Sequence, residues 1–315
     1  MLSFFPVPYP DECYYSVLCR YMVHSGISSI KEVLRVLFGR ELSPLSTMLV
    51  PYMSSRVPEW INQETGITEI TFIRDHTAFH YLTIGSKQHE TEVMLKRIRV
   101  GERNYYINGY RKNIASAYLR YCPICAYEEK MKYGEMYWHR QHQLKGNLYC
   151  IKHGARLIDS ETDLKKVKKA LIPASFALRD YYGKTPRDVM KDIKPFPTEL
   201  RQKQSAVQKD ILWLMHHGEE IGGLEGLISG YKSELAIRGL ADKRYDRLEN
   251  IPKLINKMQS YFGKALLKSL CPEKYEFMKW ESAPMGVVKF LSPLEHVLMM
   301  EYLCGSAEKF ARSSR

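Results

Sequence analysis

The segment that decides the fold covers residues 121–154 and reads YCPICAYEEKMKYGEMYWHRQHQLKGNLYCIKHG. Its two ends carry matching pairs of metal-binding side chains, Cys122 with Cys125 and Cys150 with His153. The members of each pair are three positions apart, so that a tight turn can direct both of them toward one ion. Soft thiolates and an imidazole select zinc over calcium or magnesium. Because four protein ligands leave no open position for water, the sequence predicts one structural zinc ion here.

Further histidines lie within and before this segment. His139 and His142 are three positions apart, and His76 and His80 are four apart, but neither pair has the His-Glu-x-x-His pattern of a zinc hydrolase. We expect His139 and His142 to form hydrogen bonds in the zinc module, and Glu135 to be the only acid near its centre. The sequence has no Gly-rich phosphate loop and no Gly-x-Ser-x-Gly motif. It therefore predicts that the chain is not an enzyme.

The residues before the zinc module predict short helices. Apolar side chains at helical spacing predict one helix over 11–24 and a second over 29–38. Gly26 suits a left-handed turn between them, and Ser29 with Glu32 fits a capping box at the start of the second helix. Two short helices joined in this way fit a helix-turn-helix, and a plain helical hairpin is at least as common.

The second half predicts a further helical domain. Two helical stripes of apolar residues lie in it: Val207, Ile211, Leu214 and Met215, then Ile251, Leu254, Ile255, Met258 and Phe262. Asn250 is expected to cap the second of these helices. The charged segment 159–169 reads as a linker. Since strand signals are weak, the predicted fold is mainly α, with a first domain at 1–160 (helical 1–120, zinc module 121–158) and a helical domain at 161–315.

The charge of the chain points toward polyanions. The formal net charge is +12, and residues 85–120 alone carry eight cations against three acids. Such a field attracts nucleic acid first. The cations expected to contact phosphates are Arg97, Arg99, Arg103, Arg111 and Lys112 in the first domain, and Arg238, Lys243, Arg244 and Arg247 in the second. For each of them a solvated surface role is an equally good interpretation.

Two observations bear on location. No stretch of 18 or more apolar residues is present, so a spanning helix and a membrane partner are not expected. The first residues lack a basic region followed by an apolar region and a small-residue cleavage site. The expectation is a cytoplasmic protein.

Several motifs together resemble one known family. The opening Phe5-Pro-Val-Pro-Tyr-Pro-Asp-Glu12, followed by Tyr15-Ser16 and Arg20, resembles the start of TniQ/TnsD proteins. The segment from Tyr121 to Gly154, with its Cys-Pro-Ile-Cys, Tyr-Trp-His-Arg and Cys-x-x-His-Gly elements, resembles the zinc-bearing segment of that family and is the most specific match. Residues 235–270 and 292–303 are similar in outline to the helical extension of TnsD.

The resemblance implies a target-site selector of a cut-and-paste transposon, located at the bacterial nucleoid. Such a protein binds double-stranded attachment-site DNA and recruits TnsC, an AAA+ ATPase. Shorter TniQ members instead link a CRISPR effector complex to TnsC with little DNA reading of their own, and the helical extension favours the TnsD branch. Members often continue beyond the position of Arg315, so a further C-terminal DNA-binding segment is expected in a full-length protein. A metal-dependent hydrolase that uses His76, His80, His139 and His142 is the remote alternative.

Overall fold

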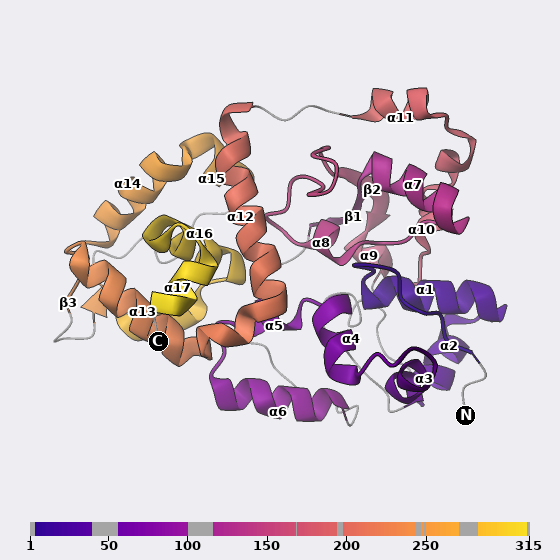
Figure 1. Ribbon diagram of the computed structural model, residues 1–315, viewed down its shortest axis with the longest axis horizontal. Coiled ribbons are helices and arrows are strands. Elements are labelled where there is room, and N and C mark those ends of the chain that lie inside the picture. Colours follow the sequence, from indigo (N-terminus) through magenta and orange to yellow (C-terminus); the bar gives the residue numbers. More distant parts are fainter. Residues whose placement is uncertain are drawn as a thin grey trace. The chain divides into compact units, whose positions relative to one another are not determined.

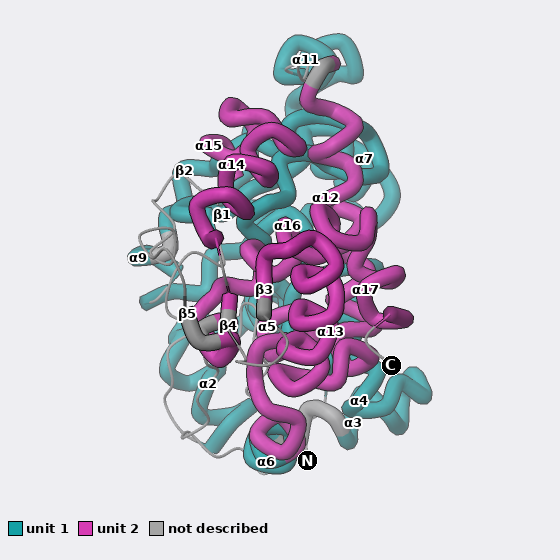
Figure 2. The backbone as a smooth tube through the Cα atoms, turned by 90° about the vertical axis from the view of Figure 1, so that its left-hand side faces the viewer, with its two compact units in different colours: residues 1–79, 93–105, 115–196 teal, residues 80–92, 106–114, 197–315 magenta. Residues whose placement is uncertain are grey.

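The computed structural model describes eight stretches of the chain: residues 4–39, 56–99, 116–167, 169–193, 198–242, 247–248, 250–270 and 283–313. Within them the chain is mainly helical, as predicted, and strands are short (Figure 1). The described residues fall into two compact units (Figure 2). Unit 1 comprises residues 1–79, 93–105 and 115–196, and unit 2 comprises residues 80–92, 106–114 and 197–315. The predicted division into domains at residue 160 stays a prediction.

Unit 1 contains most of the short helices and one two-stranded sheet. Its elements are α1 (Tyr14–Ser25), α2 (Ile30–Phe38), α3 (Arg56–Thr65), α4 (Glu69–His76), β1 (Tyr118–Tyr121), α7 (Pro123–Tyr133), α8 (Arg140–Gln143), β2 (Ile158–Asp163), α9 (Leu164–Val167), α10 (Ala174–Ala177), η2 (Arg179–Gly183) and α11 (Pro186–Asp192). Two helices, α5 (Phe79–Thr83) and α6 (Gln88–Arg99), contain residues of both units.

The first two predicted helices are present as α1 and α2. Gly26 ends α1 in the left-handed conformation, at a φ of 69° that favours glycine. The hydroxyl of Ser29 accepts a hydrogen bond from the N–H of Glu32 at 3.4 Å, which caps α2. The reading of these helices as a helix-turn-helix stays a prediction.

The first two turns of helix α1 are buried on all sides, whereas Val23 and His24 near its end are exposed. Every residue from Tyr14 to Tyr21 is buried. Trp138 is also completely buried beside it: its backbone N–H donates to the Ser16 hydroxyl at 3.0 Å, and its indole N–H donates to the Ile172 carbonyl at 2.8 Å. Apolar spacing predicts the helix but not this burial, because polar residues such as Ser16 are buried through hydrogen bonds to distant backbone groups.

Most of the segment predicted as a linker instead forms the second strand of the small sheet, β2, and the short helix α9. β2 pairs antiparallel with β1, with Arg120 opposite Asp159 and Tyr121 opposite Ile158. Ser160 and Thr162 point inward while their neighbours are more exposed, so the strand alternates with a period of two although its inward residues are polar. A strand whose inward residues are polar is not predicted from hydrophobicity. Unit 1 continues past this strand as far as residue 196.

Unit 2 is built around long helices. Its elements are α12 (Thr198–His217), η3 (Gly218–Ile221), α13 (Gly223–Ile237), β3 (Ala241–Asp242), β4 (Arg247–Leu248), α14 (Ile251–Phe262), α15 (Lys264–Leu270), β5 (Ala283–Pro284), η5 (Met285–Phe290), α16 (Pro293–Cys304) and α17 (Ala307–Ser313). The three short strands form one sheet in the order β3-β4-β5. No described helix is both long enough and apolar enough to cross a membrane.

Both predicted apolar stripes of unit 2 are buried. All four residues of the first stripe lie on α12 and all five of the second lie on α14. Asn250 occupies the position before α14, as predicted, but its backbone is left-handed (φ 51°) and its side chain makes no capping hydrogen bond. The spacing of apolar residues thus predicted both helices correctly. It did not predict the left-handed backbone of Asn250 or its lack of a capping hydrogen bond.

Candidate metal centre

The first pair of predicted ligands lies where β1 leads into α7. Cys122 is the N-terminal cap of α7, and Cys125 lies in its first turn. Pro123 occupies the start of the helix, where its fixed φ favours the helical turn and its missing N–H costs no hydrogen bond. The local sequence therefore places both thiols at the same helix end.

The second pair lies on a tight turn. Gly154, at a φ of 62°, donates its N–H to the Cys150 carbonyl at 2.7 Å. Cys150 in turn donates its N–H to the Ala155 carbonyl at 2.9 Å, so the chain reverses around residues 151–153. This reversal turns His153 back toward Cys150.

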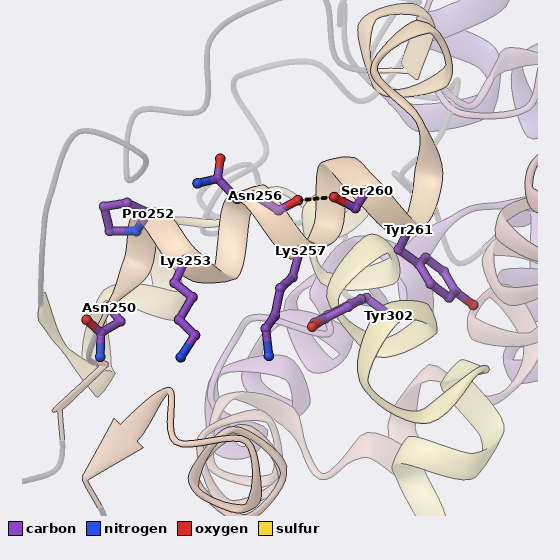
Figure 3. Close-up of a pocket in the computed structure, with 8 residues that line it drawn as sticks. All are labelled: Asn250, Pro252, Lys253, Asn256, Lys257, Ser260, Tyr261 and Tyr302. Atoms are coloured by element: carbon purple, nitrogen blue, oxygen red, sulfur yellow. Dashed lines mark hydrogen bonds between the residues drawn. The ribbon is translucent and has the colours of Figure 1, made fainter.

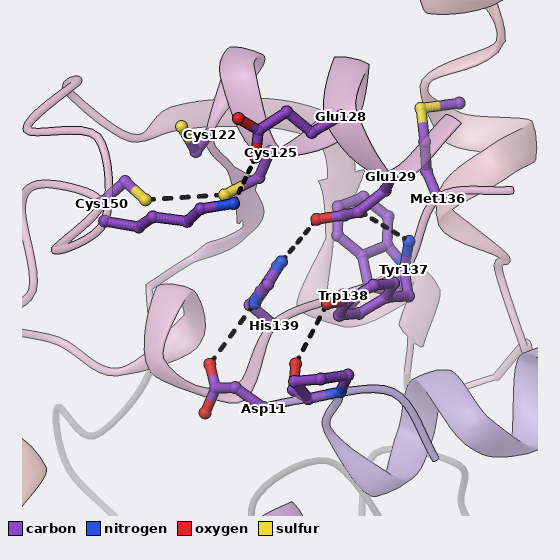
Figure 4. Close-up of polar contacts among 12 residues, drawn as sticks. Asp11, Cys122, Cys125, Glu128, Glu129, Met136, Tyr137, Trp138, His139 and Cys150 are labelled. Carbon is purple, nitrogen blue, oxygen red and sulfur yellow. Dashed lines mark hydrogen bonds and ion pairs between the residues drawn. The ribbon is translucent and has the colours of Figure 1, made fainter. Parts of the chain in front are cut away.

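The four donor atoms come together, although the two pairs are far apart in the sequence. The Sγ atoms of Cys125 and Cys150 are 3.6 Å apart (Figure 4). The Nδ1 atom of His153 lies 3.4 Å from the Sγ of Cys122, 3.3 Å from that of Cys125 and 3.5 Å from that of Cys150. All four donors lie within 4.8 Å of one another, and the group can hold a metal ion.

The spacing and chemistry of this set fit a tetrahedral zinc ion. With Zn–S and Zn–N bonds of about 2.3 and about 2.05 Å, a tetrahedron separates two sulfurs by about 3.8 Å and a sulfur from a nitrogen by about 3.6 Å. The observed distances of 3.3–3.6 Å agree to within a few tenths of an ångström. A disulfide is much shorter, at about 2.05 Å. Three thiols with one imidazole are also the donors that zinc prefers to calcium or magnesium.

A carboxylate lies behind the histidine ligand. The Nε2 atom of His153 is 3.2 Å from the Oε2 atom of Glu128, which also forms an ion pair with Lys152. Partial burial acts to raise the pKa of Glu128, but Lys152 and His153 outweigh it and lower that pKa. Since a metal-binding imidazole commonly donates its other N–H to a carboxylate, Glu128 is placed to fix the orientation of the ring.

The surroundings of the centre are largely apolar. The three cysteines are buried together with Ala155 and Leu157, and Ile124 and Ile193 pack against them. Such a shell excludes water from the sulfurs and protects a closed structural site.

A row of charged side chains beside the centre, Glu129, His139 and Asp11, links it to the N-terminal segment (Figure 4). His139 Nε2 is 2.6 Å from Glu129 Oε1, and its Nδ1 is 3.5 Å from Asp11 Oδ2. Burial acts to lower the pKa of His139, but the two carboxylates outweigh it and raise that pKa to about 10. Burial likewise acts to raise the pKa of Asp11, while His139 and Arg140 bring it down to about 2. The imidazolium is therefore held between two carboxyl groups.

A third cluster fixes the opening motif to α1. Arg20 donates from Nη1 to Glu12 at 2.8 Å and from Nε to Glu135 at 2.8 Å. Its guanidinium also lies over the ring of Tyr9, 3.7 Å from the centroid. Burial raises the pKa of Glu12 to about 7, against the opposing effect of Arg20. Glu135 thus belongs to this cluster. The expectation that it is the only acid near the module's centre is wrong, because Glu128 lies 3.2 Å from His153 and Glu129 lies beside Cys125.

The remaining histidines do not join one site. His139 forms a hydrogen bond as expected. By contrast, neither ring nitrogen of His142 has a hydrogen-bond partner among the described residues. Burial lowers the pKa of His142 to about 4. His76 bonds the Glu12 carbonyl at 2.8 Å, and His80 pairs with Glu219 at 2.8 Å. Within the described residues, the groups able to hold a metal contain none of His76, His80 and His142.

Three acids of the site, Asp11, Glu128 and Glu129, were not predicted from the sequence. The position of the two glutamates one helical turn after Cys125 was the available signal, since residues three and four apart share a helix face. Asp11 offered no local signal, because its partners His139 and Arg140 lie about 130 residues further along the chain.

Few of the cations predicted to contact DNA fall in the described residues. Arg97 is exposed on α6, and only the backbone of Arg99 and Arg247 is described. Arg238 donates to the Glu234 carboxylate at 2.7 Å and to the Leu303 carbonyl at 2.5 Å, so it also holds the end of α13 to α16. Arg103, Arg111, Lys112, Lys243 and Arg244 lie outside the described residues. A contact of any of them with DNA stays a prediction.

Comparison with known proteins identifies the segment that contains the metal centre. Residues 3–157 match the profile of the TniQ family. The chain is also similar to the Transposon Tn7 transposition protein TnsD of Escherichia coli, with 28% identity over 155 residues. That similarity covers 48% of this chain and 30% of the TnsD protein, so the matched part is less than a third of that relative.

Proposed function

The chain belongs to the TniQ/TnsD family through the TniQ domain at residues 3–157, and we propose that it is a target-site selection protein of a cut-and-paste transposon. In this proposal it binds double-stranded attachment-site DNA and recruits a TnsC-type AAA+ ATPase. The bacterial nucleoid in the cytoplasm is its place of action. The observation that carries the proposal is that the matched domain encloses the four-residue metal centre and the buried N-terminal helix α1.

The metal centre supports a structural role for zinc. Cys122, Cys125, Cys150 and His153 would hold one ion, which crosslinks the start of α7 to the turn at 151–153. When bound, zinc supplies cohesion to this part of unit 1, because four protein donors leave it no position for a reacting molecule. We therefore assign the protein no catalytic activity of its own.

A direct DNA contact is supported by the net charge of +12. Lysine and arginine side chains neutralise phosphates and release counterions, and this sequence-independent term brings a protein to the duplex before any base is read. A zinc module of this kind would keep the surface of unit 1 in place while such contacts form.

The second candidate function is a TniQ-type adapter that links a CRISPR effector complex to TnsC and touches DNA little. The TniQ domain supports this adapter function as much as it supports the DNA-binding selector. The two functions differ in whether the chain alone selects DNA. The similarity to TnsD favours the first.

The experiment is a selection from sheared genomic DNA of the host, using the immobilised chain with and without the TnsC-type ATPase encoded with it. Enrichment of one locus by the chain alone supports the DNA-reading function. Capture of the ATPase without any enriched DNA supports the adapter. Capture of neither would contradict the family-based function altogether.

A further inference from the structure

Helix α14 presents one face to the core of unit 2 and the opposite face to an open groove. Its buried residues are those of the predicted apolar stripe, whereas Lys253, Asn256 and Lys257 are exposed. The groove has a volume of about 950 Å³. It is lined by Asn250, Pro252, Lys253, Asn256, Lys257, Ser260, Tyr261 and Tyr302 (Figure 3). None of these lining residues is acidic.

The stretch that forms this face is unusually one-sided in charge. Residues 251–270, which make up α14 and α15, contain four lysines and neither aspartate nor glutamate. Lys253 and Lys257 project from the same side of α14 (Figure 3). They are four positions apart, which corresponds to a rise of about 6 Å along the helix. Among the described residues, neither of the two forms an ion pair.

The carboxylate of Glu301, which bonds the groove residue Tyr261, is turned away from solvent. Glu301 is 4% exposed, and it accepts a hydrogen bond from the Tyr261 hydroxyl at 2.9 Å. Burial raises the pKa of Glu301. On the other side of Tyr261, the ammonium of Lys203 lies 3.2 Å from the ring centroid. The acid that contacts Tyr261 is therefore enclosed, and the lysines that line the groove are Lys253 and Lys257.

The cationic character continues along the neighbouring surface of unit 2. A second groove, of about 580 Å³, is lined by Arg201 and Lys209, both exposed, and by Asp210 and Glu301. Both acids are 4% exposed, and Asp210 accepts a hydrogen bond from the Ala307 N–H at 2.9 Å. Here too the cations face solvent and the acids face the protein.

We propose that the α14 groove holds the sugar-phosphate backbone of duplex DNA, with Lys253 and Lys257 each neutralising one phosphate. This inference rests on the proposed function, since it assigns a place to the DNA contact that the function requires. Ammonium groups on flexible stems bind phosphates as point charges. Amide and hydroxyl groups from Asn250, Asn256 and Tyr302 can add hydrogen bonds to phosphate or sugar, which is the usual division of labour in DNA backbone contacts.

The chemistry of the groove favours a backbone contact over a contact with base edges. It contains no arginine, the residue whose planar fork reads guanine. The contact should therefore be independent of DNA sequence, and any site selection must come from other residues. An acidic protein surface is the other kind of partner that a cationic groove attracts, and the test separates the two.

The test measures binding of the full chain to a 20-base-pair duplex of unrelated sequence at several salt concentrations. The double variant Lys253→Gln, Lys257→Gln should reduce the slope of log K against log salt by about 1.8, because each phosphate contact contributes about 0.9. The affinity near 0.1 M salt should fall by roughly tenfold or more. The matched control is Lys264→Gln, Lys268→Gln on α15, which removes the same charge at the same spacing from exposed residues that do not line the groove.

The expected result is a change in slope for the α14 variant and an unchanged slope for the α15 variant. Equal changes in both would overturn the proposal, because they would reflect the general field of the protein rather than this groove. An unchanged slope for the α14 variant would also overturn it, and loss of ATPase capture in that variant would assign the groove to a protein partner. If the unaltered chain bound no DNA at all, the proposed function itself would fail. Thermal unfolding of all three proteins checks that the fold is intact.

Discussion

The Nε2 atom of His153 lies 3.2 Å from the Oε2 atom of Glu128, on the side of the ring opposite the three sulfur atoms that face its Nδ1. Nδ1 is therefore the nitrogen placed to bind a metal, and Nε2 has a carboxylate within ion-pair distance, although no hydrogen bond is formed between them. This arrangement makes Glu128 a positioning residue whose effect can be measured separately from that of the ligands.

Glu128→Gln should weaken zinc binding about tenfold while leaving the fold in place, because the amide keeps the size of the side chain and loses its charge. Competition with a zinc-binding indicator dye measures the change. Glu161→Gln, at an exposed position on β2, is the matched control. Equal zinc affinity in the two variants would show that Glu128 does not orient His153.

Replacement of a cysteine ligand should remove the ion and loosen unit 1. Cys122→Ser and Cys150→Ser should each lose zinc and a large part of the free energy of unfolding, since the apparent binding energy of a structural zinc is on the order of 10 kcal/mol. Thermal unfolding with and without a chelator measures the loss. Cys304→Ser lies outside the metal group and should behave as the unaltered protein. A ligand variant that unfolds at the same temperature as this control would contradict the structural role.

Gly226 tests the packing of unit 2. It lies in the first turn of α13, and a Cβ atom placed there would overlap the carbonyl oxygen of Ile221. Helix propensity alone would make alanine the better residue by about 1 kcal/mol. We expect the overlap to prevail, so that Gly226→Ala lowers the free energy of unfolding by about 1–3 kcal/mol. Urea unfolding measures it, with Gly286→Ala as the control at a site that has open space. If Gly226→Ala were more stable than the unaltered protein, the start of α13 could not lie against the carbonyl of Ile221.

Asp210 predicts a pH dependence of stability. Burial raises its pKa from 3.8 to about 7 in the folded chain. Between these values the folded state binds more protons at this group than the unfolded state, so its contribution to the free energy of unfolding falls as pH rises from about 4 to about 7. The difference across this window is at most about 4 kcal/mol. Urea unfolding at pH 5 and pH 8 should show a smaller decline for Asp210→Asn than for the unaltered protein. Asp180→Asn, at an exposed position, should keep the full decline, and the same decline in both variants would contradict the assignment.

The sequence predicted those parts of the molecule that depend on local patterns. The two turns of the metal centre could be predicted because each carries its pair of ligands within four residues, and α14 because five apolar residues recur at helical spacing. The cap of α2 was predictable for the same reason, since Ser29 and Glu32 are three residues apart.

Other features depend on contacts between distant residues. β2 is held by its pairing with β1, about 40 residues earlier, and its inward Ser160 and Thr162 gave no apolar signal. The burial of α1 depends on Trp138 and on the partners of Arg20, which include Glu135, 115 residues away. Such long-range contacts form only in the folded chain, so local sequence patterns do not predict them.

Whether the two turns share one ion is decided by the zinc content of the purified chain, determined by mass spectrometry of the metal together with the protein concentration. We expect one zinc ion per chain, and none in the folded fraction of Cys150→Ser. A folded chain with well under half an equivalent of zinc, or with the same zinc content after Cys150→Ser, would contradict the claim that the two turns share one ion.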